Sequence, residues 1–176
     1  YVLLPRFNMF SLTNLMEPAR IANYLSVEDV YHKKYLSFDG PDITASNGMA
    51  VKCEMAPGQI RRNDLIFIVG SWGAEHYANR KLFSWLRLQA RNGVRICAVE
   101  MGAYVLARAG LLARRSATTH WSYLAGFQEQ FPDVDVQEQL FTEDGPILCC
   151  SGATAGLDLM LYIIGGRHGP VSYTHL

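Results

Sequence analysis

The sequence has no excess of charge of either sign and no long apolar run. Lys and Arg together number 16, and Asp and Glu also number 16, so the formal net charge is zero. A neutral chain is not expected to bind nucleic acid by itself, because binding to phosphates needs an excess of basic residues. No apolar run approaches the roughly 20 residues that cross a bilayer, and no signal peptide is visible. We therefore expect a cytoplasmic protein with no membrane partner.

Cysteine and histidine are sparse and scattered. The four cysteines, Cys53, Cys97, Cys149 and Cys150, include no C-x-x-C pair and no disulfide-like spacing. They lie in apolar or strand-like surroundings, which indicates buried thiols in a reducing compartment. The five histidines and four cysteines show no metal-ligand spacing. The sequence therefore predicts no metal site, and it gives no sign of a cofactor.

The chain does contain enough apolar sequence for one globular domain. It has 176 residues, of which 49% are hydrophobic and 18% are charged. Predicted strands and helices alternate along it, which indicates an α/β three-layer sandwich with a mainly parallel sheet and helices on both faces. We predict strands at 1–4, 30–38, 65–69 and 94–99, an extended segment at 116–119, hairpins at 43–55 and 140–150, and helices at 11–25, 79–92, 104–112, 121–131 and 153–164.

Glycine and proline mark the expected turns and helix ends. Pro18 is placed in the early part of its helix, where proline is best tolerated. Asn47-Gly48 and Asp144-Gly145 are expected to turn the two hairpins. Gly165-Gly166 is expected to stop the last helix.

A sharp turn from a strand into a helix is predicted between residues 94 and 112. Glu100 ends the apolar strand, and the small residues Gly102 and Ala103 follow it closely. Such an elbow lifts one side chain to the carboxyl edge of the sheet and points free helix N–H groups toward the same place. Enzymes place a Ser or Cys nucleophile at this position. A carboxylate there can bind a cation, act as a base, or only cap the helix.

Ligands of parallel sheets bind at the carboxyl ends of the strands, where the loops here are 5–10, 70–73, 100–103 and 119–121. Aromatic faces beside a carboxylate suit an alkylammonium group, whereas the glycine-rich turn at 70–73 can bind an anion. The alternative is that these side chains pack in the core or at an interface. The candidate ligand residues are Glu100, Met101, His120, Trp121, Glu17, Ser71, Trp72 and Phe10.

Three segments carry a family resemblance, in the right order and at the right spacing: 102–112 (GAYVLARAGLL), 117–121 (ATTHW) and 152–159 (GATAGLDL). With them, the chain resembles the ThiJ/PfpI superfamily, which has the flavodoxin-like, class I glutamine amidotransferase-like fold. It is most similar to the amino-terminal domain of GlxA-type regulators of the AraC family. The resemblance implies a sensor domain at 1–170 and a carboxyl-terminal helix-turn-helix DNA-binding domain beyond this fragment. Residues 171–176 match nothing in that family and are expected to be linker or a foreign tail.

Enzymes of the superfamily use an elbow Cys, a downstream His and an acid on the first helix. The matching positions here are Glu100, His120 and Glu17, so the nucleophile is missing; Cys97 should be buried inside the strand. The resemblance therefore implies a sensor without catalytic residues, which forms a homodimer and contacts DNA only through the absent domain. Regulators of this type include sensors of arginine and of betaine- or carnitine-like compounds. The alternatives are a hydrolase or amidase that uses Glu100 and His120, and a dimerisation domain with an empty pocket.

Overall fold

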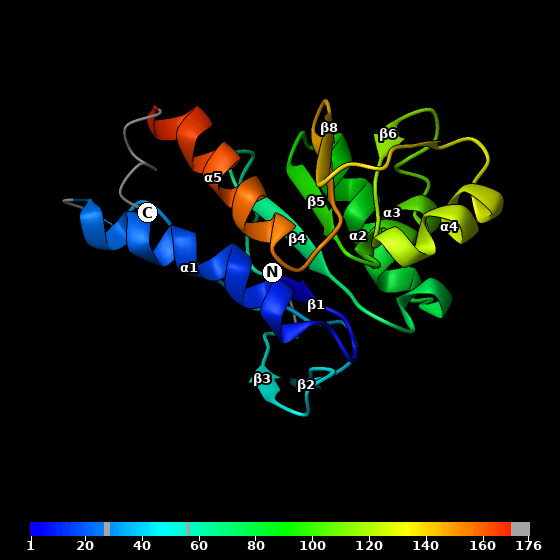
Figure 1. The fold of residues 1–176 in the computed structure, drawn as a ribbon. Coiled ribbons are helices and arrows are strands. Elements are labelled where there is room, and N and C mark those ends of the chain that lie inside the picture. The colour runs from blue at the N-terminus through cyan, green and yellow to red at the C-terminus, as the bar shows by residue number, and fades with distance from the viewer. Residues whose placement is uncertain (27–28, 56, 170–176) are drawn as a thin grey trace.

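The computed structural model describes residues 1–26, 29–55 and 57–169. They form a central sheet with helices on both faces (Figure 1). Four strands of this sheet are parallel, and its last strand, β8, runs antiparallel to β9. The predicted α/β sandwich with a mainly parallel sheet is therefore confirmed. In spatial order the strands are β1 (Val2–Leu3), β4 (Leu65–Val69), β5 (Arg95–Val99), β9 (Ile147–Cys150) and β8 (Phe141–Asp144).

Successive residues of the central strands enter two different cores. Ile68 and Ala98 face a core shared with α2 (Arg80–Arg91), α3 (Gly102–Arg108) and α4 (Leu124–Gln130). Val69 and Val99 face the other core, shared with α1 (Met9–Leu25) and α5 (Ala155–His168). Figure 1 shows these two helical layers on opposite sides of the sheet. Apolar runs such as Leu65–Val69 are buried on both sides for this reason.

Several predicted boundaries are confirmed, and the caps explain where the helices begin. The Asn79 side chain accepts hydrogen bonds from the first N–H groups of α2, and Asn8 does the same for α1. The hairpin predicted at 43–55 is present as β2 (Asp42–Thr44) and β3 (Ala50–Lys52), turned at Gly48 with φ +90°. Pro18 is not in the early part of its helix but in the middle of α1, because the helix begins at Met9.

Two other predictions were wrong. Within the predicted strand at 30–38, only Leu36 pairs, bridging Val2 and Glu54. The alternating sequence there does not find a long partner strand. The last helix does not stop at Gly165-Gly166 but continues to His168, where Gly169 (φ +84°) ends it. A helix tolerates glycine at a cost of about 1 kcal/mol, so only the residue that turns left-handed has to be its end.

The remaining elements are short. The helix predicted at 121–131 is divided into a 3-10 turn, η2 (Trp121–Tyr123), and α4. The segment predicted to be extended at 116–119 contains β6 (Ser116–Ala117), which pairs with β7 (Asp135–Val136). Another 3-10 turn, η1 (Ala74–His76), follows β4.

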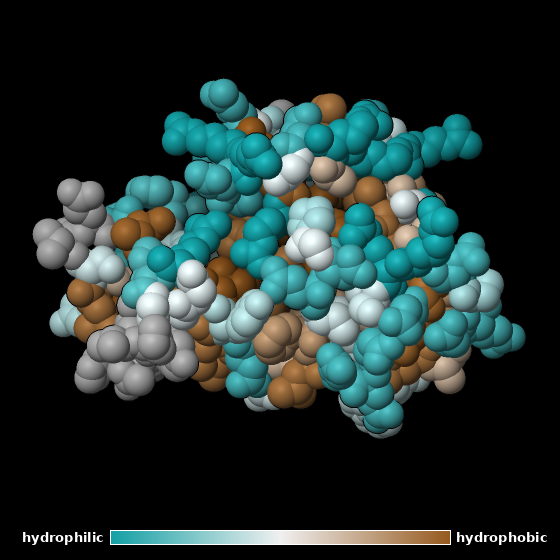
Figure 2. All heavy atoms as spheres, turned by 90° about the horizontal axis from the view of Figure 1, so that it is seen from above, coloured by the Kyte–Doolittle hydropathy of each residue, from teal (hydrophilic) through white to brown (hydrophobic). Residues whose placement is uncertain are grey.

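No helix in the described part of the chain has the length and hydrophobicity of a membrane span. Seen from above, the surface is covered mainly by hydrophilic side chains, and hydrophobic atoms show in separate areas between them (Figure 2). Within the described residues, no group of three or more His, Cys, Asp or Glu side chains is placed to hold a metal ion. The proposed tail at 171–176 lies outside the described residues.

Candidate functional site

The predicted elbow is present between β5 and α3. Glu100 has a left-handed backbone with φ +54°, which a residue with a side chain rarely adopts. Its N–H donates to the Cys150 carbonyl at 2.9 Å, and its own carbonyl accepts from the Thr119 hydroxyl at 2.8 Å. The end of β9 and the loop after β6 therefore hold the strained residue in place.

The Glu100 side chain points inward rather than into open solvent. It is 3% exposed. Its Oε1 accepts from the Asn8 amide at 2.6 Å and from the Ser11 hydroxyl at 3.1 Å, and the Ser71 hydroxyl supplies a further hydrogen bond. Gly152 covers it so closely that a Cβ on Gly152 would lie 1.9 Å from Glu100 Cγ. The carboxylate is therefore sealed beneath the turn between β9 and α5.

All of these donors are neutral, and in residues 1–26, 29–55 and 57–169 no salt bridge to Glu100 is formed. Burial raises the pKa of Glu100, and the hydrogen bonds from Asn8, Ser11 and Ser71 oppose that rise. The site thus holds a carboxylate that is solvated by dipoles but has no counter-charge.

The raised pKa of Glu100 predicts a characteristic pH dependence of stability. Because the folded pKa lies above the unfolded value of 4.5, the contribution of Glu100 is fully present below pH 4.5. This contribution is lost as the pH rises from 4.5 through the folded pKa. Glu100→Gln keeps an acceptor for Asn8 and Ser11 but does not ionise. We expect the free energy of unfolding of Glu100→Gln, relative to wild type, to increase across that interval.

Urea denaturation between pH 4 and pH 8 measures this difference. Glu129→Gln, at an exposed position of α4, is the matched control for loss of a carboxylate. A difference that shrinks as the pH rises would mean that the hydrogen bonds outweigh burial and that the pKa of Glu100 is lowered instead.

His120 does not hydrogen-bond Glu100 among the described residues. Its Nδ1 lies 2.8 Å from the Ser122 hydroxyl and also accepts from the Ser122 N–H, so the ring caps η2. Its ring packs on Trp121, with centroids 5.6 Å apart, and burial lowers its pKa. The pairing of acid and histidine that a hydrolase would need is absent from this arrangement.

The structure does not bring Glu17 to Glu100. Glu17 is half exposed and pairs with Arg20 at 2.7 Å. It lies six residues beyond Ser11, and six residues turn an α-helix by about 240°, so the two side chains leave the helix in different directions. Asn8 and Ser11 are the α1 residues that meet Glu100. Asn8 was missed although an Asn directly before an apolar helix is a cap signal.

The three predicted aromatic residues are exposed and lie close in sequence to groups that hydrogen-bond Glu100. Phe10, Trp72 and Trp121 are 54%, 59% and 74% exposed, respectively. Each lies within two residues of a group that hydrogen-bonds Glu100: Phe10 precedes Ser11, Trp72 follows Ser71, and Trp121 follows Thr119 at a distance of two. We call these three residues the aromatic rim. Met101, another candidate, is buried in the core instead.

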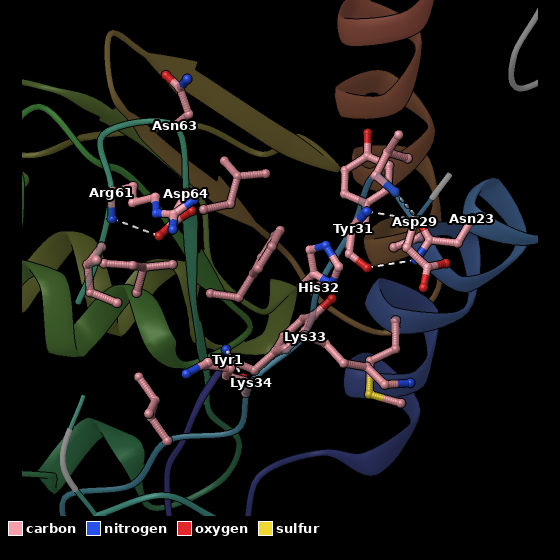
Figure 3. A pocket seen from close by; sticks show the side chains of 18 of the residues that line it. Tyr1, Asn23, Asp29, Tyr31, His32, Lys33, Lys34, Arg61, Asn63 and Asp64 are labelled. Atoms are coloured by element: carbon pink, nitrogen blue, oxygen red, sulfur yellow. Dashed lines mark hydrogen bonds between the residues drawn. The ribbon is translucent and has the colours of Figure 1, made fainter. Parts of the chain in front are cut away.

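The cavities lie elsewhere. One of about 700 Å³ lies where β1 and β4 begin, the end of these strands away from the elbow, and Tyr1, Asn23, Tyr31 and Arg61 are among its lining residues (Figure 3). Asn23 hydrogen-bonds both the N–H and the carbonyl of Tyr31 there. A smaller hollow between α1 and α5 includes Glu17. Glu100 lines neither of these two cavities.

The sequence of the whole domain matches a known protein family. The profile of the DJ-1/PfpI family matches residues 1–166, nearly the whole described chain. The chain belongs to the DJ-1/PfpI family. The resemblance to the ThiJ/PfpI superfamily is thereby confirmed. In this member of the family, the elbow residue is Glu100.

Several of its relatives are regulators. The HTH-type transcriptional regulator CdhR of Pseudomonas aeruginosa is 40% identical over 97% of this chain and 50% of its own length. The HTH-type transcriptional regulator GlxA of Rhizobium meliloti is 31% identical over 96% of this chain and 52% of its own length. The chain thus spans about half the length of these curated relatives. This agrees with the resemblance to GlxA-type regulators.

A solved structure shows the same fold. An AraC family transcriptional regulator from Pseudomonas putida superimposes with a TM-score of 0.84, covering 99% of this chain and 94% of the other at 23% identity. This confirms the fold of the domain.

Proposed function

We propose that this DJ-1/PfpI domain is the effector-binding half of a transcription regulator and that it catalyses no reaction. The observation that carries the proposal is the elbow, where a buried carboxylate is held by three neutral donors. In this proposal, Glu100 replaces the nucleophilic Cys of the superfamily's enzymes. The thiols do not replace it, because Cys97, Cys149 and Cys150 are buried. Burial raises the pKa of Cys149 and Cys150 to about 12, so they remain unreactive thiols.

We propose further that the effector is a small cation, such as an alkylammonium compound. The aromatic rim offers exposed π faces, and Glu100 below it supplies negative charge without a cationic partner. Cations are attracted to aromatic faces by about 0.5–2 kcal/mol each, more where water is excluded. In this geometry the cation contacts Phe10, Trp72 and Trp121 first, and Glu100 acts from beneath Gly152. His120 packs against the same rim.

In this proposal the regulator is a cytoplasmic homodimer. It contacts DNA through a part that the present chain does not include. The named relatives and their twofold greater length support this division of labour. Light scattering during gel filtration of the chain, with and without effector, measures whether it pairs. A monomer under both conditions would contradict the dimer.

A thermal-shift panel tests the effector proposal. Arginine, carnitine, glycine betaine, choline and putrescine are compared with neutral and anionic metabolites, and 3,3-dimethylbutanol serves as the uncharged isostere of choline. A ligand at 100 times its Kd stabilises by about 2.7 kcal/mol, which raises Tm by about 5–10 °C for a domain of this size. We expect such a shift for at least one cation and none for its neutral isostere.

The variant Trp72→Leu locates the site, because this exposed residue can lose its aromatic face with little effect on the fold. We expect it to weaken binding about tenfold or more, while Tyr24→Leu, an exposed aromatic near the far end of α1, leaves binding unchanged. A shift produced only by anions, or one indifferent to Trp72→Leu, would refute the proposed cation site.

A further inference from the structure

The Ser11 hydroxyl connects Glu100 to the turn that begins α5. Ser11 is fully buried. Its Oγ donates to Glu100 Oε1 at 3.1 Å and accepts from the Ala153 N–H at 2.8 Å. A hydroxyl has one proton to donate, and Ser11 donates it to the carboxylate of Glu100. The oxygen of the same hydroxyl accepts the hydrogen bond from the Ala153 N–H. Moving the carboxylate away therefore removes the partner that orients the hydroxyl toward Ala153.

Side chains of α1 hydrogen-bond both the N–H and the carbonyl of Ala153. Asn14, one helical turn beyond Ser11, donates its side-chain amide to the Ala153 carbonyl at 3.1 Å. Ala153 has φ +50°, and Gly152 before it has φ +96°. A left-handed alanine costs about 1–2 kcal/mol, so this turn keeps its shape only while its hydrogen bonds persist.

The two ends of this connection lie at different parts of the domain. At one end, Phe10 of the aromatic rim lies between Asn8 and Ser11, so a ligand that contacts Phe10 presses on the first turn of α1. At the other end, α5 begins two residues after Ala153, runs beside α1 and ends at His168 (Figure 1). Gly156 of α5 lies against α1, since a Cβ there would lie 3.5 Å from Asn14 and Leu15.

We infer that Glu100, Ser11 and Ala153 form a latch that sets the position of α5 according to whether the aromatic rim is occupied. Ser11 is a positioning residue in this inference, since it is buried and acts through Glu100 and Ala153. The inference rests on the proposed effector function for its input. Its output is α5, the last helix of the described chain.

The first arm of the test needs no effector. Native-state hydrogen exchange is measured on the whole chain for wild type, Ser11→Ala and Thr13→Ala. The Thr13 hydroxyl donates only to a carbonyl of its own helix, so its removal is the matched control. We expect Ser11→Ala to speed exchange in residues 153–160 about tenfold, the effect of losing one buried hydrogen bond, with β4 and β5 unchanged. Exchange in 153–160 equal to wild type would overturn the latch.

The second arm uses choline, or whichever cation of the panel shifts Tm most. Saturating cation is expected to change exchange along α5 in wild type. In Ser11→Ala we expect saturating cation still to raise Tm while the α5 response disappears, a separation that simple destabilisation would not produce. An α5 response retained in Ser11→Ala would overturn the latch. If no cation binds wild type, the effector proposal fails and the first arm decides the latch alone.

Discussion

Replacing Gly102 with alanine is expected to lower the free energy of unfolding by about 4 kcal/mol or more, a large part of the stability of a typical domain. A Cβ at this position would lie 2.3 Å from the carbonyl oxygen of Ile68. That oxygen belongs to the backbone of β4 in the middle of the sheet, so it cannot turn aside as a flexible side chain could. The start of α3 would have to move away from the sheet, and the elbow with it.

Urea denaturation of the purified variant, or its loss from the soluble fraction, measures this effect. Gly166→Ala is the control, because Gly166 lies inside α5 and, among the described residues outside its own stretch of helix backbone, no atom lies within 4 Å of the place that its new methyl group would take. Alanine in an open helical site should stabilise by up to about 1 kcal/mol. A Gly102→Ala protein as stable as wild type would mean that the helix does not approach β4 in this way.

The elements predicted best are those whose signals are local. The apolar runs at 65–69 and 94–99 and the Asn47-Gly48 turn all appear where expected. Each is decided by residues adjacent in sequence: burial of the run on both faces, or a glycine that turns left-handed. The elbow belongs to the same group, because a strand, an acid and two small residues follow one another directly.

The errors concern choices that depend on distant residues. Alternation at 30–38 looks like a strand, but a strand exists only where a partner offers hydrogen bonds, and here only Leu36 finds them. Gly165 and Gly166 look like a stop, yet α5 continues to His168, and Arg167 in its last turn donates a hydrogen bond to the distant Asn63 carbonyl at 2.8 Å. Propensity is weak compared with such tertiary contacts.

The candidate site shows the same division. The sequence predicts that Glu100 lies at the elbow and that Phe10, Trp72 and Trp121 lie on loops at the same edge. It does not predict that the carboxylate turns inward, since its lid, Gly152, is fifty-two residues away and its donors come from the start of α1 and from the loop after β4. Glu17 was chosen by family analogy, whereas the geometry of the helix favours Asn8 and Ser11.

Gly152→Ala is the second substitution with a large expected effect, about 3–5 kcal/mol of lost stability. Two causes act together. The new Cβ would lie 1.9 Å from Glu100 Cγ, and φ +96° is unfavourable for any residue with a side chain. Unlike the Gly102 clash, the first cause involves a side chain, so it can be removed by shortening Glu100.

A double-mutant cycle with Glu100→Ala separates the two causes. Truncation removes the two atoms nearest the new methyl group and leaves Glu100 Cβ at 3.1 Å, so Gly152→Ala should then cost mainly the backbone strain of about 1–2 kcal/mol. The donors that Glu100→Ala leaves unpaired, Asn8 and Ser11, are common to both arms and cancel. We expect a coupling energy of about 2 kcal/mol or more from urea denaturation of the four proteins.

This coupling also decides how an effector can use Glu100. If it is found, the carboxylate is sealed beneath Gly152, a cation meets the aromatic rim first, and its presence reaches α5 through Ser11 and Ala153. If the two costs simply add, Glu100 does not lie beneath Gly152, and a cation contacts the carboxylate directly. In that case Glu100→Gln should weaken cation binding at least as strongly as Trp72→Leu does, whereas a sealed carboxylate predicts a smaller loss of affinity for Glu100→Gln than for Trp72→Leu.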